Sequence, residues 1–513
     1  MYPSIYFFAT LICQYCVLIS CRAQIQTVLQ EQTPEIHFEA AIIEVPVDHF
    51  NPADNRTYAN HFWTNDTFYR KGGPVFFYDA GERGVSDGNL VTLSNEAHPL
   101  MNLTRAFHGL GIVWEHRFYG QSSPFPLSID STDVEKRAAY EFLDTEQALE
   151  DAVFFATHFE RTDTDLKPSA TPWVWIGGSY PGQRAAMIRH RNSDVFFASY
   201  SSSAAVEVRT SLPEYDLHIS HDLPVRCGEI VRQAVRYADG VLIDGSRIAK
   251  FELRWAIARR WSADQRTRKE RLLYAFAAPD FIVASHFTAL TAADWQWRGM
   301  DTTGRMAATC ASIRSANFDS APGTAMGTIL DAIEANNRHF EGTNGGSGLS
   351  QLDDQAWQYQ VCTEYFELRT AAPQDPYNII SAIMTTDNIW ADNCARRCPW
   401  LDPPSDPKLR APSLYAGWDK NVSNVMFVTG LRDPWHEVSI APSKGLIPDA
   451  PHDRTMTAKV PRCNETMTGR EVFGLVLPEG RHCGDLIPGS QDAEKATALF
   501  VKALEAWLPC FGQ

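Results

Sequence analysis

Short apolar runs and stretches with helical spacing alternate along much of the chain. Runs rich in β-branched and aromatic residues predict strands at residues 40–47, 58–69, 73–78, 111–114, 174–176, 195–200, 424–429 and 471–477. Apolar residues at helical spacing predict helices at residues 144–159 and 492–508. Strands that alternate with helices are typical of an α/β fold.

The pattern changes between residues 207 and 411. This segment is mixed in polarity, and helical spacing recurs at residues 247–261, 266–276 and 328–340. A Gly/Ser-rich stretch at residues 342–350 interrupts it. We therefore expect a helical insertion (cap) domain at residues 207–411. It would divide a sheet-containing domain into a first part at residues 24–206 and a second part at residues 412–513.

The stretch around Ser179 has the pattern of a strand, a sharp turn and a helix. An apolar run ends at Gly177-Gly178, presents Ser179, and continues as small residues suited to a closely packed helix. This is the pattern of a nucleophile elbow, which holds a serine above the edge of a sheet. Pro181 stands where the G-x-S-x-G motif has its second glycine, and Gly182 follows one place later. Proline is tolerated in a first helical turn. The alternative interpretation is a simple Gly-Ser turn.

An acid and a histidine follow two later predicted strands. Asp433 lies just beyond the strand at residues 424–429, and His482 lies just beyond the strand at residues 471–477. The chain order Ser, Asp, His is that of the α/β-hydrolase fold. A serine hydroxyl needs a neutral imidazole to accept its proton, and the imidazole needs a carboxylate to orient it. We therefore predict a triad of Ser179, Asp433 and His482, with His436 as the competing histidine.

Several blocks of this sequence resemble one serine peptidase family. The three catalytic blocks are Gly177-Gly178-Ser179-Tyr180-x-Gly182, Asp433-Pro434-Trp435 and His482-Cys483-x-Asp485-Leu486. Further blocks begin at Val47, Glu115, Glu146 and Gln360. Together they resemble the family of lysosomal Pro-X carboxypeptidase, dipeptidyl peptidase II, thymus-specific serine protease and fungal acid prolyl endopeptidases. The resemblance implies an α/β-hydrolase fold with a large, mainly helical insertion.

The resemblance also implies a role for each residue of the active site. Ser179 would be the nucleophile, His482 the general base and then acid, and Asp433 the residue that orients it. The oxyanion would be held by the backbone N–H of Tyr180 and by that of Gly81 or Glu82. The stretch Asp79-Ala80-Gly81-Glu82 differs from the Gly-Asn-Glu-Gly of animal members and is nearer the Pro-Gly-Glu of fungal ones.

Family resemblance further implies cleavage after proline, so the expected partners are peptides or proteins that contain proline. Trp435 is a candidate wall of the proline pocket, or packs in the core beneath the Asp433 loop. Glu364 is a candidate anchor for a substrate terminus, and a solvated surface carboxylate is the alternative. Activity under mildly acidic conditions would require a lowered pKa for His482, so we expect burial to outweigh the effect of Asp433. The alternative is that an acid optimum reflects protonation of another group that contacts the substrate. Carboxypeptidase, dipeptidyl aminopeptidase and endopeptidase activity remain open.

Features of secreted proteins recur along the chain. An apolar segment from Ile5 to Ile19, followed by small residues, predicts a signal peptide at residues 1–23. Eight cysteines follow it, an even number that suits four disulfides, although the spacing selects no pairing. Zinc binding by Cys394 and Cys398 is the less favoured alternative. N-glycosylation sequons occur at Asn55, Asn65, Asn102, Asn421 and Asn464.

Charge narrows the possible partners. The formal net charge is −16, which disfavours binding to nucleic acid and to anionic lipid. We expect no cofactor, no metal and no stable membrane span after signal removal, with a monomer or homodimer as the assembly. Secretion is the expected destination, and lysosome or vacuole is the alternative.

Two other functions compete with peptidase activity. An esterase or lipase has the same fold and triad. A catalytically inactive hydrolase fold that serves as a binding protein is the other alternative, although such a protein usually lacks a triad member.

Overall fold

The computed structural model describes residues 38–259, 267–285, 295–300, 305–315, 326–327, 330–331, 350–401, 417–442, 445–467 and 470–512. The chain divides into two compact units, Met1–Glu39 and Ala40–Gln513. The helices and strands described below belong to the second unit. The expected signal peptide lies outside the described residues.

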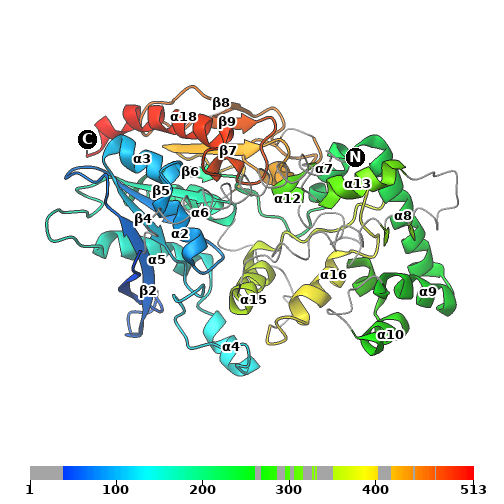
Figure 1. The fold of residues 1–513 in the computed structure, drawn as a ribbon. Helices are drawn as coiled ribbons and strands as arrows, with labels where there is room; N and C mark the ends of the chain where they lie inside the picture. Colours follow the sequence, from blue (N-terminus) through cyan, green and yellow to red (C-terminus); the bar gives the residue numbers. More distant parts are fainter. Residues whose placement is uncertain are drawn as a thin grey trace, which may run out of the picture. The chain divides into compact units, whose positions relative to one another are not determined.

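A mixed sheet lies in the part of this unit outside residues 207–411 (Figure 1). Its strands are β1 (Ala41–Pro46), β2 (Thr57–Asn65), β3 (Val75–Asp79), β4 (Leu110–Trp114), β5 (Trp173–Gly178), β6 (Phe196–Ser202), β7 (Val425–Gly430), β8 (Thr455–Thr457) and β9 (Glu471–Leu477). Their order across the sheet is β1-β2-β4-β3-β5-β6-β7-β9-β8. The pairs β1–β2 and β2–β4 are antiparallel, and the others are parallel. This arrangement confirms the predicted α/β-hydrolase fold.

Helices cover both faces of the sheet, and two neighbouring residues of β3 show how. Phe76 contacts Phe107 of α3 (Pro99–Phe107), with ring centroids 6.2 Å apart. Phe77 contacts Phe155 of α5 (Thr145–His158), at 5.8 Å. Consecutive strand side chains point to opposite faces, so α3 and α5 lie on opposite sides. The other helices of this part of the chain are α2 (Asp87–Ser94), α4 (Asp133–Tyr140), α6 (Tyr180–Arg191) and α18 (Gln491–Trp507).

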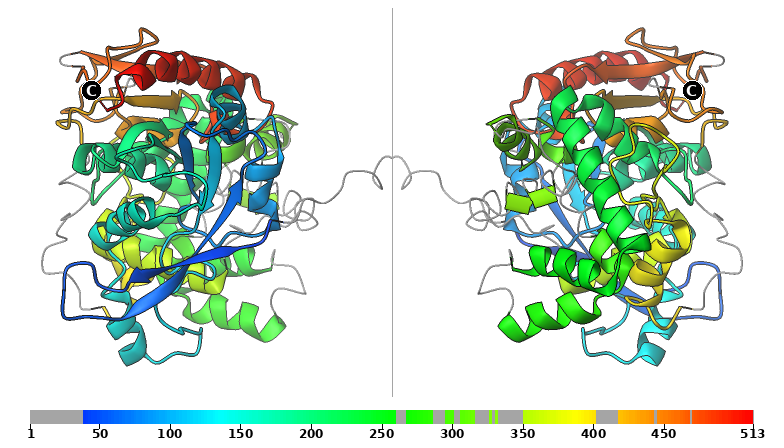
Figure 2. Two further views of the ribbon diagram at one scale, coloured as in Figure 1. Left: turned by 90° about the vertical axis from the view of Figure 1, so that its left-hand side faces the viewer. Right: turned by 90° about the vertical axis from the view of Figure 1, so that its right-hand side faces the viewer.

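The described part of residues 207–411 is mainly helical, as predicted (Figures 1 and 2). Its helices are α7 (Glu214–Asp222), α8 (Val225–Asp244), α9 (Arg247–Ala258), α10 (Arg268–Ala277), α12 (Trp295–Arg298), α13 (Arg305–Ser315), α15 (Gln351–Gln360) and α16 (Thr386–Ile389). Two π-helical turns follow α15 and α16, at Val361–Tyr365 and Trp390–Ala395. In α8, apolar residues from Ile230 to Leu242 recur at helical spacing and enter a shared core. The predicted helix at residues 328–340 lies almost entirely outside the described residues.

Two details of the strand prediction differ from the structure. β2 ends at Asn65, because the chain turns at once, and the N–H of Tyr69 donates to the carbonyl of Asp66 at 2.9 Å. The sequence prediction also missed β8, which has only three residues and therefore too few positions to show alternation.

Six of the eight cysteines beyond residue 23 form three disulfides. The pairs are Cys227–Cys310, Cys362–Cys394 and Cys463–Cys510. The expectation of four disulfides was therefore wrong, since Cys398 and Cys483 are free thiols. Zinc binding by Cys394 with Cys398 is also excluded, because Cys394 is bonded to Cys362.

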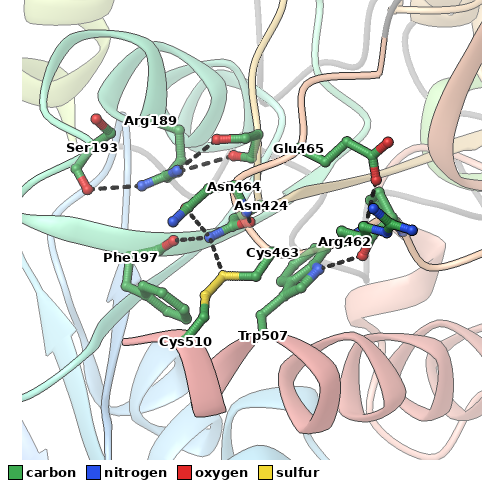
Figure 3. The surroundings of a disulfide bond; sticks show 12 residues. Arg189, Ser193, Phe197, Asn424, Arg462, Cys463, Asn464, Glu465, Trp507 and Cys510 are labelled. Atoms are coloured by element: carbon green, nitrogen blue, oxygen red, sulfur yellow. Dashed lines mark hydrogen bonds between the residues drawn. A yellow bond between two sulfur atoms is a disulfide. The ribbon is translucent and has the colours of Figure 1, made fainter. Parts of the chain in front are cut away.

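The third disulfide lies beside the start of β7 (Figure 3). The side-chain amide of Asn424 donates to the carbonyl of Phe197 and to Oδ1 of Asn464, both at 3.0 Å. The disulfide links this region to Cys510, just beyond α18. The end of the chain is thus fixed to the sheet that carries the candidate site.

We predict opposite effects on stability from Gly182→Ala and Gly240→Ala. A Cβ at Gly182 would lie 2.3 Å from the backbone oxygen of Ser202, so we expect a loss of about 1–3 kcal/mol. Gly240 lies exposed in α8 with nothing near its would-be Cβ. Alanine there should stabilise by about 0.5–1 kcal/mol, because glycine weakens a helix interior. Thermal unfolding of both variants at one scan rate measures this, and a stable Gly182→Ala variant would contradict the close packing of α6 on β6.

Candidate active site

Ser179 lies on a strained turn between β5 and α6. Its backbone has φ 65° and ψ −127°, a conformation that non-glycine residues rarely adopt and that is often found at functional sites. The Ser179 N–H donates to the carbonyl of Ser202 at 2.9 Å. A Cβ at Gly177 would lie 2.3 Å from the backbone oxygen of Pro181. The turn therefore requires glycine there, as the elbow pattern predicts.

Asp433 and His482 form a close pair. Nδ1 of His482 lies 2.8 Å from Oδ2 of Asp433, and both side chains are buried. Oδ1 of Asp433 accepts the N–H of Trp435 at 3.1 Å, which fixes the carboxylate. The N–H of His482 donates to the carbonyl of Gln296, so α12 holds the histidine loop. The carboxylate is thus placed to set the imidazole tautomer.

The pKa of His482 is shifted in the opposite direction from the one expected from the sequence. Burial acts to lower the pKa of His482, but the Asp433 carboxylate and neighbouring Cys483 outweigh it, and the pKa is raised well above 6.5. The expectation that burial wins over the carboxylate was therefore wrong. A histidine 2.8 Å from a buried carboxylate keeps its proton more strongly than one in water.

A cavity of about 190 Å³ contains Ser179. The described residues that line it are Tyr78, Asp79, Ala80, Glu82, Arg83, Thr92, Val113, Gly178, Ser179, Pro181, Trp297, Cys483 and Leu486. Trp297 also contacts the ring of His482, with centroids 5.0 Å apart. The structure therefore brings the nucleophile turn and the surroundings of the histidine to one place. No sequence signal marked Trp297, because its position depends on the fold of the insertion.

The loop that follows β3 lies next to the nucleophile turn. Gly81 has φ +73°, and a Cβ there would meet the ring of Pro181 at 2.4 Å. The Gly81 N–H donates to Oδ1 of Asp79 at 3.1 Å. Oδ2 of Asp79 lies 2.9 Å from Nη1 of Arg184 in α6. The expected oxyanion residues Gly81, Glu82 and Tyr180 are thus brought close to Ser179, with the Gly81 N–H already engaged.

The ring of Tyr180 is held by groups from distant parts of the sequence. Its hydroxyl lies 2.8 Å from Nε2 of His116 and accepts a bond from Nε2 of Gln360 at 2.9 Å. The guanidinium of Arg184 lies 5.4 Å from the ring centroid. Sequence reasoning singled out neither His116 nor Arg184 for this role, since only the folded chain brings them together.

Two residues expected at the substrate pocket lie in different surroundings. Trp435 is half-buried, and its ring lies 6.4 Å from His482 and 5.1 Å from Tyr215. It also packs against the core of the helical segment, so both interpretations of Trp435 agree with its position. Glu364 is buried, and its Oε2 accepts bonds from the N–H and hydroxyl of Thr145. The solvated interpretation of Glu364 was therefore wrong, and a role toward substrate stays a prediction.

A carboxyl that the sequence did not indicate also approaches His482. Phe366 and Glu367 both have positive φ, 54° and 46°. Oε1 of Glu367 is buried with no hydrogen-bond partner among the described residues. Burial raises the pKa of Glu367 to about 8, and the charge of His482 opposes that shift.

The predicted sequons differ in exposure. Asn55, Asn421 and Asn464 are exposed, whereas Asn65 and Asn102 are half-buried. The side-chain nitrogen of Asn65 donates to the carbonyl of Leu93 at 2.7 Å. Glycosylation at all five positions stays a prediction. Among the residues that the structure describes, no group of three or more His, Cys, Asp or Glu is placed to hold a metal ion.

Comparisons with known proteins agree on one family. The family model described as "Serine carboxypeptidase S28" matches residues 45–448. Serine protease vicPb of Bipolaris victoriae is 24% identical, over 80% of this chain and 79% of that protein. A probable extracellular serine carboxypeptidase of Arthroderma benhamiae is also 24% identical, over 83% and 64%. Mouse lysosomal Pro-X carboxypeptidase is 30% identical over a shorter region, 33% of this chain and 32% of that protein.

We predict that the acidic limb of kcat/KM lies above pH 6.5. A histidine that acts as a base is inactive when protonated, and the pKa of His482 is raised. Rates measured from about pH 4 to 9 locate the limb. Glu367→Gln is the matched control, because Glu367 titrates nearby with a pKa of about 8. A limb below pH 6.5, or one that disappears in the Glu367 variant, would show that His482 does not set it.

Proposed function

The chain belongs to the serine carboxypeptidase S28 family and is a serine-type peptidase, and from this premise we propose that it hydrolyses peptide bonds after proline through a Ser-His-Asp acyl-enzyme mechanism. The observation that carries the proposal is the buried His482–Asp433 pair, 2.8 Å apart, beside the strained turn of Ser179. Family membership favours a peptidase over the esterase and the inactive binding protein.

In the proposed mechanism Ser179 attacks the scissile carbonyl. His482 accepts the hydroxyl proton and then passes it to the leaving amine, while Asp433 holds the imidazole tautomer and stabilises the imidazolium. Water then repeats the sequence on the acyl-enzyme, with His482 again as base. The raised pKa of His482 supports the first half of each step, because the imidazole accepts a proton more readily when Asp433 stabilises the imidazolium.

The oxyanion of the tetrahedral intermediate would be held by backbone N–H groups. Tyr180 supplies one, at the first position of α6, where helix N–H groups lack internal partners. The second comes from the loop after β3. The Gly81 N–H is bonded to Asp79, and the Glu82 N–H interacts with the carboxyl group of Glu82 itself, so Gly81 and Glu82 both remain candidates. Removing one such donor typically costs about 10²–10³ in kcat.

Proline specificity is supported by two observations. A relative with 30% identity is named a Pro-X carboxypeptidase. The half-buried ring of Trp435 lies near His482 and offers a flat apolar wall to a compact prolyl ring. Glu364 is too deeply engaged with Thr145 to be our first candidate for binding a substrate terminus.

The proposed destination is the secretory pathway. A fungal relative is named extracellular and a mouse relative lysosomal, and both compartments are compatible with the disulfides. In the described residues we find no helix that is long and apolar enough to cross a membrane. A monomer or homodimer remains the proposed assembly.

We predict that Ser179→Ala and His482→Ala abolish hydrolysis, whereas His436→Ala only impairs it. Loss of a nucleophile or its base costs on the order of 10⁶ in kcat. His436 is buried, with Nδ1 3.0 Å from the hydroxyl of Thr429, so it is the matched control. Steady-state kinetics on folded variants decide the assignment. An inactive His436 variant beside an active His482 variant would overturn it.

We also predict a preference for proline at the residue before the scissile bond. Two peptides that differ only by proline or alanine at this position should differ about 10-fold or more in kcat/KM, because a close-fitting pocket rejects a poorer fit. Trp435→Ala should reduce the preference. Equal rates on the two peptides would remove the specificity claim and leave a serine peptidase of other preference.

A further inference from the structure

The cavity beside Ser179 lies where the leaving part of a substrate has to depart. His482 gives its proton to the leaving amine, so that amine must lie next to the imidazole. Two residues that line the cavity come soon after His482 in the chain: Cys483 follows it directly, and Leu486 follows four residues later. A third, Trp297, contacts the His482 ring. The cavity is therefore placed to receive the residue on the carboxyl side of the scissile bond.

Arg83 is the cationic side chain among the described residues that line this cavity. It is half-buried, and no hydrogen bond or ion pair joins it to the residues that the structure describes. The other buried arginine nearby, Arg184, is instead committed to Asp79. Arg83 is thus a positive charge beside the nucleophile, with Glu82 as its acidic neighbour in the cavity lining but without a hydrogen bond or ion pair to it.

The backbone around Arg83 is fixed on both sides. Before it, Gly81 is bonded to Asp79. After it, the N–H of Gly84 donates to Oδ2 of Asp353 in α15 at 3.1 Å, and the N–H of Val85 donates to Oε1 of Glu115 at 2.8 Å. A charged side chain on a fixed backbone loses less entropy when it binds a partner. Such preorganisation is expected of a binding group.

We propose that Arg83 binds the α-carboxylate of the substrate's C-terminal residue in this cavity, so that the enzyme releases one residue from the carboxyl end. This inference rests on the proposed function and on the carboxypeptidase activity after which the family is described, and it adds the residue that recognises the substrate's C-terminus. A guanidinium binds a carboxylate through two parallel N–H donors. The covalent steps are those of the acyl-enzyme mechanism, with the free amino acid as the first product.

The size and charge of the cavity fit this ligand. A volume of about 190 Å³ is smaller than the roughly 300–1,000 Å³ of pockets for drug-sized ligands, which suits a single residue rather than a longer peptide. Glu82 also lines the cavity and would repel a carboxylate if ionised. Burial raises the pKa of Glu82, although the positive charges of Arg83, His482 and Arg184 oppose that shift, so its ionised form is less favoured than in an exposed glutamate.

The test compares one blocked peptide, acetyl-Ala-Pro-Phe, as the free acid and as the C-terminal amide. We expect the unmodified enzyme to prefer the acid by about 10- to 100-fold in kcat/KM, the range for a charged hydrogen-bonded contact. Arg83→Gln should bring the ratio near 1, and Arg83→Lys should restore part of it. Arg432→Gln is the control, because Arg432 pairs with Asp222 and lines a different cavity. It should keep the preference.

Two further arms separate this inference from the proposed function. Acetyl-Ala-Ala-Phe, as acid and as amide, gives the acid-to-amide ratio of kcat/KM for a peptide without proline. Slow cleavage of the proline peptides would then count against proline specificity and leave the role of Arg83 to be judged from this ratio. Each peptide is also tested for how well it protects Ser179 from reaction with a fluorophosphonate. This compares binding of the acid with binding of the amide without any turnover. Equal rates and equal protection by acid and amide, or an unchanged ratio in Arg83→Gln, would overturn the inference.

Discussion

The buried ion pair between Asp79 and Arg184 connects the two halves of the candidate site. Both side chains are fully buried, with Nη1 of Arg184 2.9 Å from Oδ2 of Asp79. The guanidinium also lies 5.2 to 5.5 Å from the ring centroids of Trp114, Trp175 and Tyr180. Asp79 also accepts the N–H of Gly81. The pair therefore connects the loop that follows β3 to α6, the helix that begins after Ser179. Breaking a buried pair by removing one partner typically costs about 3–5 kcal/mol, so the pair constrains fold and site together.

A second constraint comes from the helical segment, which supplies groups around His482 rather than the triad itself. Gln296 accepts the N–H of His482, and the ring of Trp297 lies against the imidazole. Glu367 brings a further carboxyl to the same region from a strained backbone. The sheet thus carries the turns and loops of Ser179, Asp433 and His482, while the helical segment contacts His482 and contributes to its electrostatic surroundings.

The sequence predicted those features that depend on local pattern. The strands that precede Ser179 and Asp433 are buried, and the strand that precedes His482 is partly buried. All three are continuous apolar runs and were therefore visible in the sequence, and the glycine at position 177 marked the turn. Contacts between distant segments were not predictable in this way. Arg184 looked like one polar residue in a helix, and Trp297 like one aromatic residue in an insertion, because their partners lie far away in the chain. The pKa of His482 was mispredicted for a related reason. Burial lowers this pKa and the Asp433 carboxylate raises it. Which effect prevails depends on the distance between the imidazole and the carboxylate, and the sequence does not give that distance.

In the mechanism that we propose, the His482–Asp433 pair activates Ser179 for attack. Reaction of the full chain with a fluorophosphonate, followed by peptide mapping by mass spectrometry, tests it most directly, because the reagent bonds to a serine only where a base activates the hydroxyl. We expect one modified residue, Ser179, at a rate that rises with pH as His482 loses its proton. Modification of a different serine, or no modification of folded protein at any pH, would contradict it.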